Sequence, residues 1–270
     1  MKYKLVISDF DGTLLRRDDI ISDETKSAIK EFVSSGGIFG ISTGRSFESI
    51  SKRLGELGLE GRFPVMSCQG ALSNDSESGT LLADIPMDKK AAVEFLLRAE
   101  NMGLTCQFYT EKDVFVPELN KVNRYYFERT RLTPIAVEKV SDYALSTQEK
   151  IYKTLCFINP GDRTRVIGKM QGIAGTQVFA SHAMLVEAVS SHAGKGNGLI
   201  ATCKAYGILP ELSVAIGDEL NDVEMIKAAG LGVAMANAVD EAKKAADYVT
   251  DTNENDGVAK VLRKIISGEL

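Results

Sequence analysis

Short apolar runs alternate with amphipathic helical segments at both ends of this 270-residue chain, and this alternation constrains the fold more than any other feature. Near the N-terminus, residues 4–8 form a run rich in β-branched side chains, which is typical of a buried strand. Ser22, Asp23 and Glu24 then supply a helix N-cap and two acids for the first turn, and the glycine pair at 36–37 ends that helix. A strand–helix order of this kind predicts a parallel sheet with right-handed crossovers.

The other predicted elements extend this pattern and interrupt it once. In the N-terminal part we expect strands at 38–42 and 65–67 and a helix at 46–57. In the C-terminal part we expect strands at 213–216 and 231–235 and helices at 198–206, 222–229, 239–246 and 258–266. The middle favours a hairpin at 105–109 and 114–116, strands at 153–158 and 177–180, and helices at 89–102 and 163–171. The sequence therefore predicts an α/β protein: a Rossmann-like core made of 1–85 and 190–270, with an α+β domain inserted at 86–189.

Composition excludes several classes of protein. The chain is 44% hydrophobic and 26% charged, which is ordinary for a compact globular protein. Its net charge of −5, with acids and bases mixed, lacks the basic surface of a nucleic-acid binder. The four cysteines form no Cys-x-x-Cys pair, so we expect reduced thiols in a cytoplasmic protein: Cys68, Cys106, Cys156 and Cys203. The apolar run before Asp9 is too short for a signal peptide or a membrane span.

Asp9 and Asp11 stand one residue apart at the carboxyl end of the first predicted strand. Ligands bind at that edge of open α/β sheets. A carboxylate there is able to attack phosphorus and form a covalent aspartyl phosphate. The second acid is then placed to protonate the leaving oxygen and later to activate water. An ordinary Asp-Gly turn accounts for the same residues equally well, so this pair alone leaves both interpretations open.

A second acidic segment, Asp218 to Asp222, favours the catalytic interpretation. It follows the predicted strand at 213–216 and opens a helix, whose N-terminus favours anions. Two further carboxylates near Asp9 would repel it unless a hard cation lay among them, and Mg²⁺ suits such an all-oxygen site. Asp222 as a simple helix cap is the alternative, but a cap does not explain Asp218.

Phosphoryl transfer also needs fixed donors and a positive charge. Thr43 ends the second predicted strand and offers a hydroxyl beside the backbone amides of Gly44 and Arg45. Lys195, in the Gly194-Lys195-Gly196 run, supplies a point charge. Taken singly, a Thr at a strand end and a Lys among glycines are usually structural or solvated. Their places beside elements of the same predicted sheet make them candidates for the site.

Together these segments resemble the haloacid dehalogenase-like hydrolase superfamily. The resemblance rests on Asp9-Phe10-Asp11-Gly12-Thr13-Leu14, Ser42-Thr43-Gly44-Arg45, Lys195-Gly196 and Gly217-Asp218 through Asp222. The chain looks closest to the Cof-type branch, in which a large α/β cap of the C2 type follows the second motif, and Asn255-Asp256-Gly257-Val258-Ala259 resembles the ending of that branch. One departure is Gln69 before Gly70, where the family often has Asn.

The resemblance implies a role for each motif residue. Asp9 would be the nucleophile, and Asp11 the general acid and base. Mg²⁺ would be held by Asp9, the backbone carbonyl of Asp11, Asp218 and, through water or hydrogen bonds, Asp222. The phosphoryl group would be held by Thr43, Gly44 and Lys195, and Asn221 would orient the phosphate or Lys195.

These implied roles predict a Mg²⁺-dependent phosphatase that hydrolyses a small phosphorylated metabolite, a sugar phosphate or phosphorylated cofactor, through an aspartyl-phosphate intermediate. A phosphomutase of the same superfamily is one alternative, and a phospholigand-binding regulator without turnover is another. An acid at position 11 favours phosphatase or phosphomutase chemistry over the ATPase members, which carry Thr there. In the inserted domain, Arg124 and Tyr125 belong to a stretch of cations and aromatics that is either a solvated helix face or a contact for the substrate.

Overall fold

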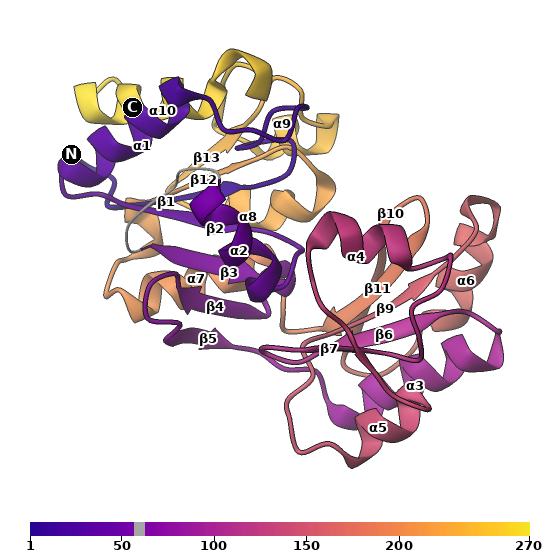
Figure 1. The fold of residues 1–270 in the computed structure, drawn as a ribbon. Coiled ribbons are helices and arrows are strands. Elements are labelled where there is room, and N and C mark those ends of the chain that lie inside the picture. Colours follow the sequence, from indigo (N-terminus) through magenta and orange to yellow (C-terminus); the bar gives the residue numbers. More distant parts are fainter. Residues whose placement is uncertain (57–62) are drawn as a thin grey trace. The chain divides into compact units, whose positions relative to one another are not determined.

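The computed structural model describes residues 1–56 and 63–270, and its contacts divide the chain into two compact units (Figure 1). Unit 1 comprises Met1–Thr43, Arg53–Asp84 and Gly194–Leu270, and unit 2 comprises Gly44–Lys52 and Ile85–Ala193. The chain passes between the units after Asp84 and again after Ala193. Residues 44–52 are a difference, because the sequence analysis placed them in the core and they group with unit 2.

Unit 1 contains an eight-stranded sheet in the order β14-β13-β12-β1-β2-β3-β4-β5. Its strands are β1 (Leu5–Asp9), β2 (Ile38–Ser42), β3 (Pro64–Ser67), β4 (Leu72–Asp75), β5 (Leu81–Asp84), β12 (Ser213–Gly217), β13 (Leu231–Ala234) and β14 (Tyr248–Val249). Neighbours from β14 to β3 are parallel, whereas β4 and β5 add an antiparallel extension. β1 pairs in parallel with both β2 and β12, so the segments that leave these three strands emerge at one edge of the sheet.

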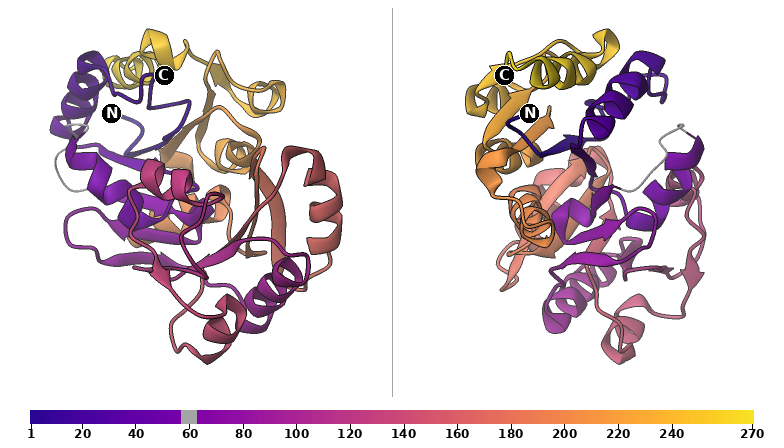
Figure 2. Two further views of the ribbon diagram at one scale, coloured as in Figure 1. Left: turned by 45° about the vertical axis from the view of Figure 1, so that its right-hand side comes forward. Right: turned by 90° about the vertical axis from the view of Figure 1, so that its left-hand side faces the viewer.

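Helices cover both faces of this sheet. They are α1 (Asp23–Ser34), α7 (Lys195–Ala205), α8 (Val223–Ala228), α9 (Asp240–Ala245) and α10 (Gly257–Ser267), with 3-10 turns η1 (Cys68–Gly70), η3 (Pro210–Leu212), η4 (Leu220–Asp222) and η5 (Asn253–Asn255). α7 and α8 pack on the face that carries Leu5, Ile7 and Ala215. α1 and α10 pack against each other, so the two ends of the chain lie in one region (Figure 2).

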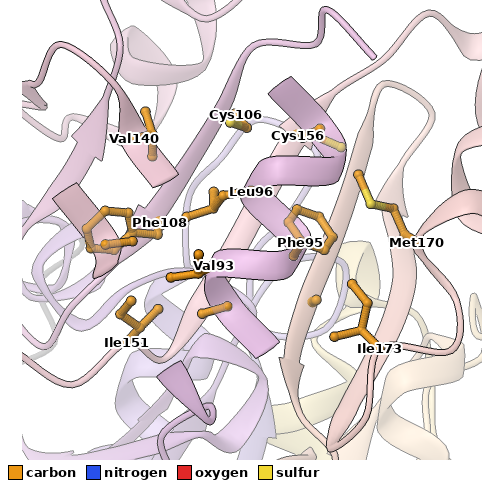
Figure 3. Packing of buried hydrophobic residues seen from close by; sticks show 14 of the residues in the cluster. Val93, Phe95, Leu96, Cys106, Phe108, Val140, Ile151, Cys156, Met170 and Ile173 are labelled. Atoms are coloured by element: carbon orange, nitrogen blue, oxygen red, sulfur yellow. The ribbon is translucent and has the colours of Figure 1, made fainter. Parts of the chain in front are cut away.

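Unit 2 contains a six-stranded sheet in the order β10-β11-β9-β6-β7-β8. Its strands are β6 (Cys106–Tyr109), β7 (Val114–Val116), β8 (Ile135–Ala136), β9 (Lys153–Phe157), β10 (Thr176–His182) and β11 (Leu185–Ser190). Its helices are α3 (Lys89–Asn101), α4 (Arg124–Thr130), α5 (Val140–Ser146), α6 (Arg163–Met170) and the turn η2 (Pro160–Asp162), and α2 (Phe47–Glu56) starts in this unit. Phe95 and Leu96 of α3 pack with Phe108 and Cys156 of the sheet in a buried apolar core (Figure 3).

The predicted elements recur with small shifts in their bounds. The Ser22 N-cap is confirmed, since its side chain accepts a hydrogen bond from the backbone N–H of Thr25. The helix expected at 198–206 begins earlier, since Lys195 is the first residue of α7. The strands β4, β5, β8, β11 and β14 and the helix α5 were not expected. The last residue of the helix predicted at 46–57 lies outside the described residues. Over 1–56 and 63–270, no helix combines the length and apolar character needed to cross a membrane.

Candidate functional site

The carboxyl ends of β1 and β12 bring two acidic segments together in unit 1. Asp9 is the last residue of β1, and Asp218 directly follows β12, its parallel neighbour. Because neighbouring parallel strands end at the same edge of a sheet, both carboxylates lie where ligands bind in open α/β folds. Asp222 ends the short turn η4 that follows Asp218 and is fully buried. The structure therefore places the three acids at one point.

Lys195, the first residue of α7, lies between two of these acids. Its Nζ donates to Oδ1 of Asp9 and to Oδ1 of Asp222, the second at 2.6 Å. The side chain of Lys195 is only 2% exposed, and those of Asp9 and Asp222 are 8% and 0% exposed. These ion pairs are thus shielded from water, so removing one partner of such a pair costs about 3–5 kcal/mol.

The surroundings of the cluster disfavour the ionised forms of Asp9 and Asp218. Burial raises the pKa of Asp9 well above its ordinary value, and repulsion from Asp222 and Asp218 adds to the effect while Lys195 opposes it. Burial also raises the pKa of Asp218 to about 6, although Oγ1 of Thr13 donates a hydrogen bond to its Oδ1 at 2.6 Å. Burial alone would lower the pKa of Lys195, but the carboxylates of Asp222 and Asp9 outweigh it and raise that pKa. The folded cluster therefore has more negative charge than its ammonium neutralises.

A divalent cation fits this excess of negative charge. One carboxylate oxygen from each of Asp9, Asp218 and Asp222 lies within 4.8 Å of the other two. At that separation, and with an effective dielectric constant of about 20, two unit negative charges repel by roughly 3 kcal/mol. The donors are all oxygen atoms, which is the ligand type that Mg²⁺ prefers. On donor type, burial and charge, these residues suit a small hard cation.

Asp222 also organises the turn that carries Asp218. Its Oδ2 accepts hydrogen bonds from the backbone N–H groups of Asp218 at 3.0 Å and Glu219 at 2.9 Å, and its Oδ1 accepts the bond from Lys195. Both oxygens of this carboxylate therefore already have donors. The arrangement makes Asp222 an anchor for the 217–222 turn and for Lys195 at the same time.

Gly12 lies directly against Asp218, and its conformation excludes other residues. Its φ is +89°, and a Cβ at this position would lie 2.5 Å from Oδ2 of Asp218. We expect Gly12→Ala to lower kcat/KM by about 100-fold or more, because displacing a reacting group by about 1 Å costs roughly that factor. Gly36→Ala is the matched control, since Gly36 has a φ of +85° and nothing within 4 Å of its Cβ position. Equal kcat/KM values for the two variants would contradict the assignment of Asp218 to the site.

Thr43 and Gly44 stand at the end of β2. Thr43 is buried, its backbone N–H donates to the carbonyl of Met66 at 2.8 Å, and its own carbonyl accepts from the N–H of Gln69 at 3.1 Å. The carbonyl of Gly44 accepts a hydrogen bond from Nζ of Lys153 at 2.9 Å, and both of these residues belong to unit 2. Thr43 is thus held by β3 and η1, and the residue after it is held by unit 2.

Gln69 has a contact that the sequence analysis did not predict. Its Oε1 accepts a hydrogen bond from Nδ2 of Asn221 at 2.9 Å, and its backbone has a φ of +59° in the left-handed region. The departure from the family pattern at position 69 therefore still gives Asn221 a side-chain partner. The sequence analysis also gave no role to Thr13, whose hydroxyl donates to Asp218. Its place in the first motif could have marked it as a site residue.

The remaining predicted residues have exposed side chains. Asp11 is exposed and forms an isolated bridge with Leu15 in the loop that follows β1. Arg124 and Tyr125 begin α4 in unit 2, and both are exposed, Tyr125 to 67%. The structure brings together Asp9, Lys195, Asp218 and Asp222, with Asp11 two residues along the chain from Asp9.

The sequence as a whole matches known proteins over almost its full length. The family described as haloacid dehalogenase-like hydrolase matches residues 6–262. The 5-amino-6-(5-phospho-D-ribitylamino)uracil phosphatase YwtE of Bacillus subtilis strain 168 is 28% identical over 296 residues, which cover 98% of this chain and 99% of that protein.

Solved structures share the fold. A haloacid dehalogenase-like hydrolase from Bacteroides thetaiotaomicron has a TM-score of 0.85 and 26% sequence identity, with 97% of this chain and 99% of that chain covered. The sugar phosphatase BT4131, of subclass IIB, has a TM-score of 0.81 and 22% identity, with 97% and 98% covered. The likeness extends through the inserted domain, so the capped fold expected from the sequence is confirmed.

Proposed function

Since this chain belongs to the haloacid dehalogenase-like hydrolase family and is a phosphoric monoester hydrolase, we propose that it is a Mg²⁺-dependent phosphatase of small phosphorylated metabolites, with Asp9 as the nucleophile. The observation that carries this proposal is the buried cluster in which Lys195 pairs with Asp9 and Asp222 beside Asp218. The ammonium of Lys195 favours the ionised form of Asp9, against burial and the repulsion from Asp222 and Asp218, and it orients that carboxylate as a nucleophile must be.

In the first half of the reaction, a carboxylate oxygen of Asp9 attacks the phosphorus of the ester. The bond between phosphorus and the leaving oxygen breaks, and Asp11 gives its proton to that oxygen, so the alcohol departs neutral. In the second half, Asp11 accepts a proton from a water molecule whose oxygen attacks the phosphorus. Inorganic phosphate leaves and the carboxylate of Asp9 is regenerated, so one water is consumed in each cycle.

The metal would be held by Asp9, the backbone carbonyl of Asp11 and Asp218. Asp222 would act from outside, because its oxygens accept hydrogen bonds from Lys195 and from the backbone of the 217–222 turn. When bound, Mg²⁺ neutralises charge on Asp9 and on the phosphoryl oxygens. Thr43, the backbone N–H of Gly44, Lys195 and Asn221 would hold the phosphoryl group.

We assign the chemistry to unit 1 and the selection of substrate to unit 2. YwtE is named for a phosphorylated ribitylamino uracil, which supports a phosphorylated sugar, sugar alcohol or sugar-bearing cofactor as the substrate here. The four cysteines are free and buried, which supports a reducing, cytoplasmic location.

A panel of phosphorylated metabolites tests this proposal. Purified protein with Mg²⁺ should release inorganic phosphate from at least one sugar, sugar-alcohol or cofactor phosphate. Asp9→Asn protein prepared in parallel identifies any contaminating phosphatase. Release by the wild-type protein that equals release by the variant for every compound would overturn the proposal.

Arg124 and Tyr125 test the assignment of unit 2. If they contact the organic part of the substrate, Arg124→Ala and Tyr125→Ala should lower kcat/KM for the best metabolite by about tenfold. Hydrolysis of p-nitrophenyl phosphate, which lacks that organic part, should change by less than about twofold. Arg163→Ala is the matched control, since Arg163 is an exposed arginine of unit 2 that begins a different helix, α6. Equal losses on both substrates would show that this segment is structural.

A further inference from the structure

The loop between Asp11 and α1 is held by side chains from the C-terminal part of unit 1. Nδ2 of Asn237 donates to the carbonyl of Gly12 at 2.9 Å. Nδ2 of Asn253 donates to the carbonyl of Leu15 at 2.7 Å. These two carbonyls flank the turn that follows the general acid and base of the proposed reaction.

The two asparagines are also joined to each other. The backbone N–H of Asn253 donates to Oδ1 of Asn237 at 3.1 Å, so the amide of Asn237 links the chain at 253 to the chain at 12. Asn237 lies between β13 and α9, and Asn253 begins η5. Two separate C-terminal loops thus meet on one loop near the N-terminus.

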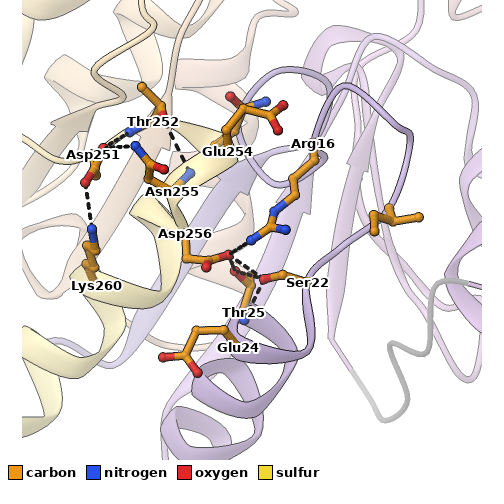
Figure 4. A network of polar contacts seen from close by, with 12 residues as sticks. Arg16, Ser22, Glu24, Thr25, Asp251, Thr252, Glu254, Asn255, Asp256 and Lys260 are labelled. Atoms are coloured by element: carbon orange, nitrogen blue, oxygen red, sulfur yellow. Dashed lines mark hydrogen bonds and ion pairs between the residues drawn. The ribbon is translucent and has the colours of Figure 1, made fainter.

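Asp256 fixes the far end of the same loop. Its Oδ1 accepts from Nη2 of Arg16 at 2.8 Å, from the hydroxyl of Ser22 and from the hydroxyl of Thr25 (Figure 4). Ser22 is the N-cap of α1, so this carboxylate fastens the start of that helix to the loop. Glu254 also holds this loop, because its Oε1 accepts a hydrogen bond from the backbone N–H of Arg17 at 2.8 Å.

Asp11 lies inside the braced segment. It is bonded to Gly12, whose carbonyl Asn237 holds, and it bridges to Leu15, whose carbonyl Asn253 holds. Asp11 is exposed, and the backbone that follows it is held at both Gly12 and Leu15. We propose, on the basis of the function proposed above, that Asn237 and Asn253 are positioning residues that keep Asp11 where it can protonate the leaving oxygen.

The test compares two leaving groups, because a general acid matters most when the departing oxygen is strongly basic. The value of kcat/KM reports the steps up to departure of the alcohol, and general acid catalysis contributes about 10²–10⁴-fold to such steps. We expect Asn237→Ala and Asn253→Ala to lower kcat/KM for the best alkyl phosphate by about 10–100-fold. The same variants should lower kcat/KM for p-nitrophenyl phosphate by less than about threefold.

Asn255→Ala is the matched control. Asn255 lies in the same turn as Asn253, and its Nδ2 donates to Asp251 at 3.1 Å rather than to the 12–17 loop (Figure 4). This variant should keep the wild-type ratio of the two kcat/KM values. That ratio does not depend on how much of a preparation is folded, so partial unfolding cannot imitate the effect. Asn237 is exposed, which makes Asn237→Ala the safer variant if Asn253→Ala folds poorly.

Each outcome decides the proposal. A selective loss on the alkyl phosphate in either asparagine variant supports it. Equal losses on the two substrates, or no loss on either, overturn it. A wild-type protein that hydrolyses neither ester refutes the phosphatase function itself, and this result is distinct from a failure of the positioning role.

Discussion

Asp9→Asn is expected to lower kcat by at least about 10⁴-fold, because the amide cannot form the covalent phosphoryl intermediate that divides the reaction into two steps. The variant should remain folded. Burial and repulsion from Asp222 and Asp218 already disfavour the charged form of Asp9 in the folded protein, and a neutral side chain of the same shape removes that repulsion. Its Oδ1 can still accept from Lys195, so that the ammonium retains two partners.

Steady-state phosphate release and the thermal unfolding midpoint check this prediction together. Asp75→Asn is the matched control, since Asp75 is another fully buried carboxylate at the end of a strand, β4, and its Oδ1 binds the neighbouring turn at Glu77 and Ser78. It should keep its activity. Turnover by a clean Asp9→Asn preparation at more than a small fraction of the wild-type rate would refute the nucleophile assignment.

Removal of the divalent cation with EDTA is expected to lower kcat by at least about 100-fold, and added Mg²⁺ should restore it. The physical reason is the cluster itself, in which Asp9, Asp218 and Asp222 lie within 4.8 Å of one another beside the ammonium of Lys195. Without the cation, the phosphoryl group would enter a site that is already too negative, and several kcal/mol of charge stabilisation would be lost. Full activity of protein shown to be free of metal would contradict the proposed metal-binding role of Asp9 and Asp218.

The same cluster predicts a pH dependence of stability. Asp218 has a pKa of about 6 in the folded, metal-free protein, above the value of about 4 for an unperturbed Asp. Because the folded state disfavours the ionised form, metal-free protein should lose stability as the pH rises from about 4 through about 6. Bound Mg²⁺ should remove this loss. Thermal unfolding midpoints measured across that pH range, with and without Mg²⁺, check this prediction. The same pH dependence of the midpoint under both conditions would contradict it.

Local patterns predicted the parallel core well because its strands and caps carry their own signals. β2 begins and ends as expected, at Ile38 and Ser42, and Ser22 caps α1 as its spacing indicated. The acids of both motifs follow buried strands, so the topology of parallel neighbours was enough to bring Asp9 and Asp218 to one edge. Lys195 lay outside the helix predicted at 198–206, whereas α7 begins at Lys195, and its ammonium pairs with Asp9 and Asp222.

The rest depends on contacts between residues that are far apart in the sequence. β4, with the sequence Leu-Ser-Asn-Asp, has almost no apolar pattern, and it is a strand because β3 and β5 pair with it on either side. The hydrogen bond from Asn221 to Gln69 joins η4 to η1 across 152 residues of sequence. The hydrogen bonds from Asn237 and Asn253 to the 12–17 loop join residues more than two hundred positions apart, and no local sequence pattern predicts them.

The most direct test of the account is to trap the covalent intermediate. Wild-type protein is mixed with substrate and Mg²⁺, quenched in acid during turnover and treated with borohydride, which reduces an acyl phosphate to an alcohol. Peptide mass spectrometry should then find residue 9 converted from aspartate to homoserine, in an amount that depends on substrate. Continued phosphate release with no reduction at residue 9, or with reduction at Asp218 instead, would contradict the central claim.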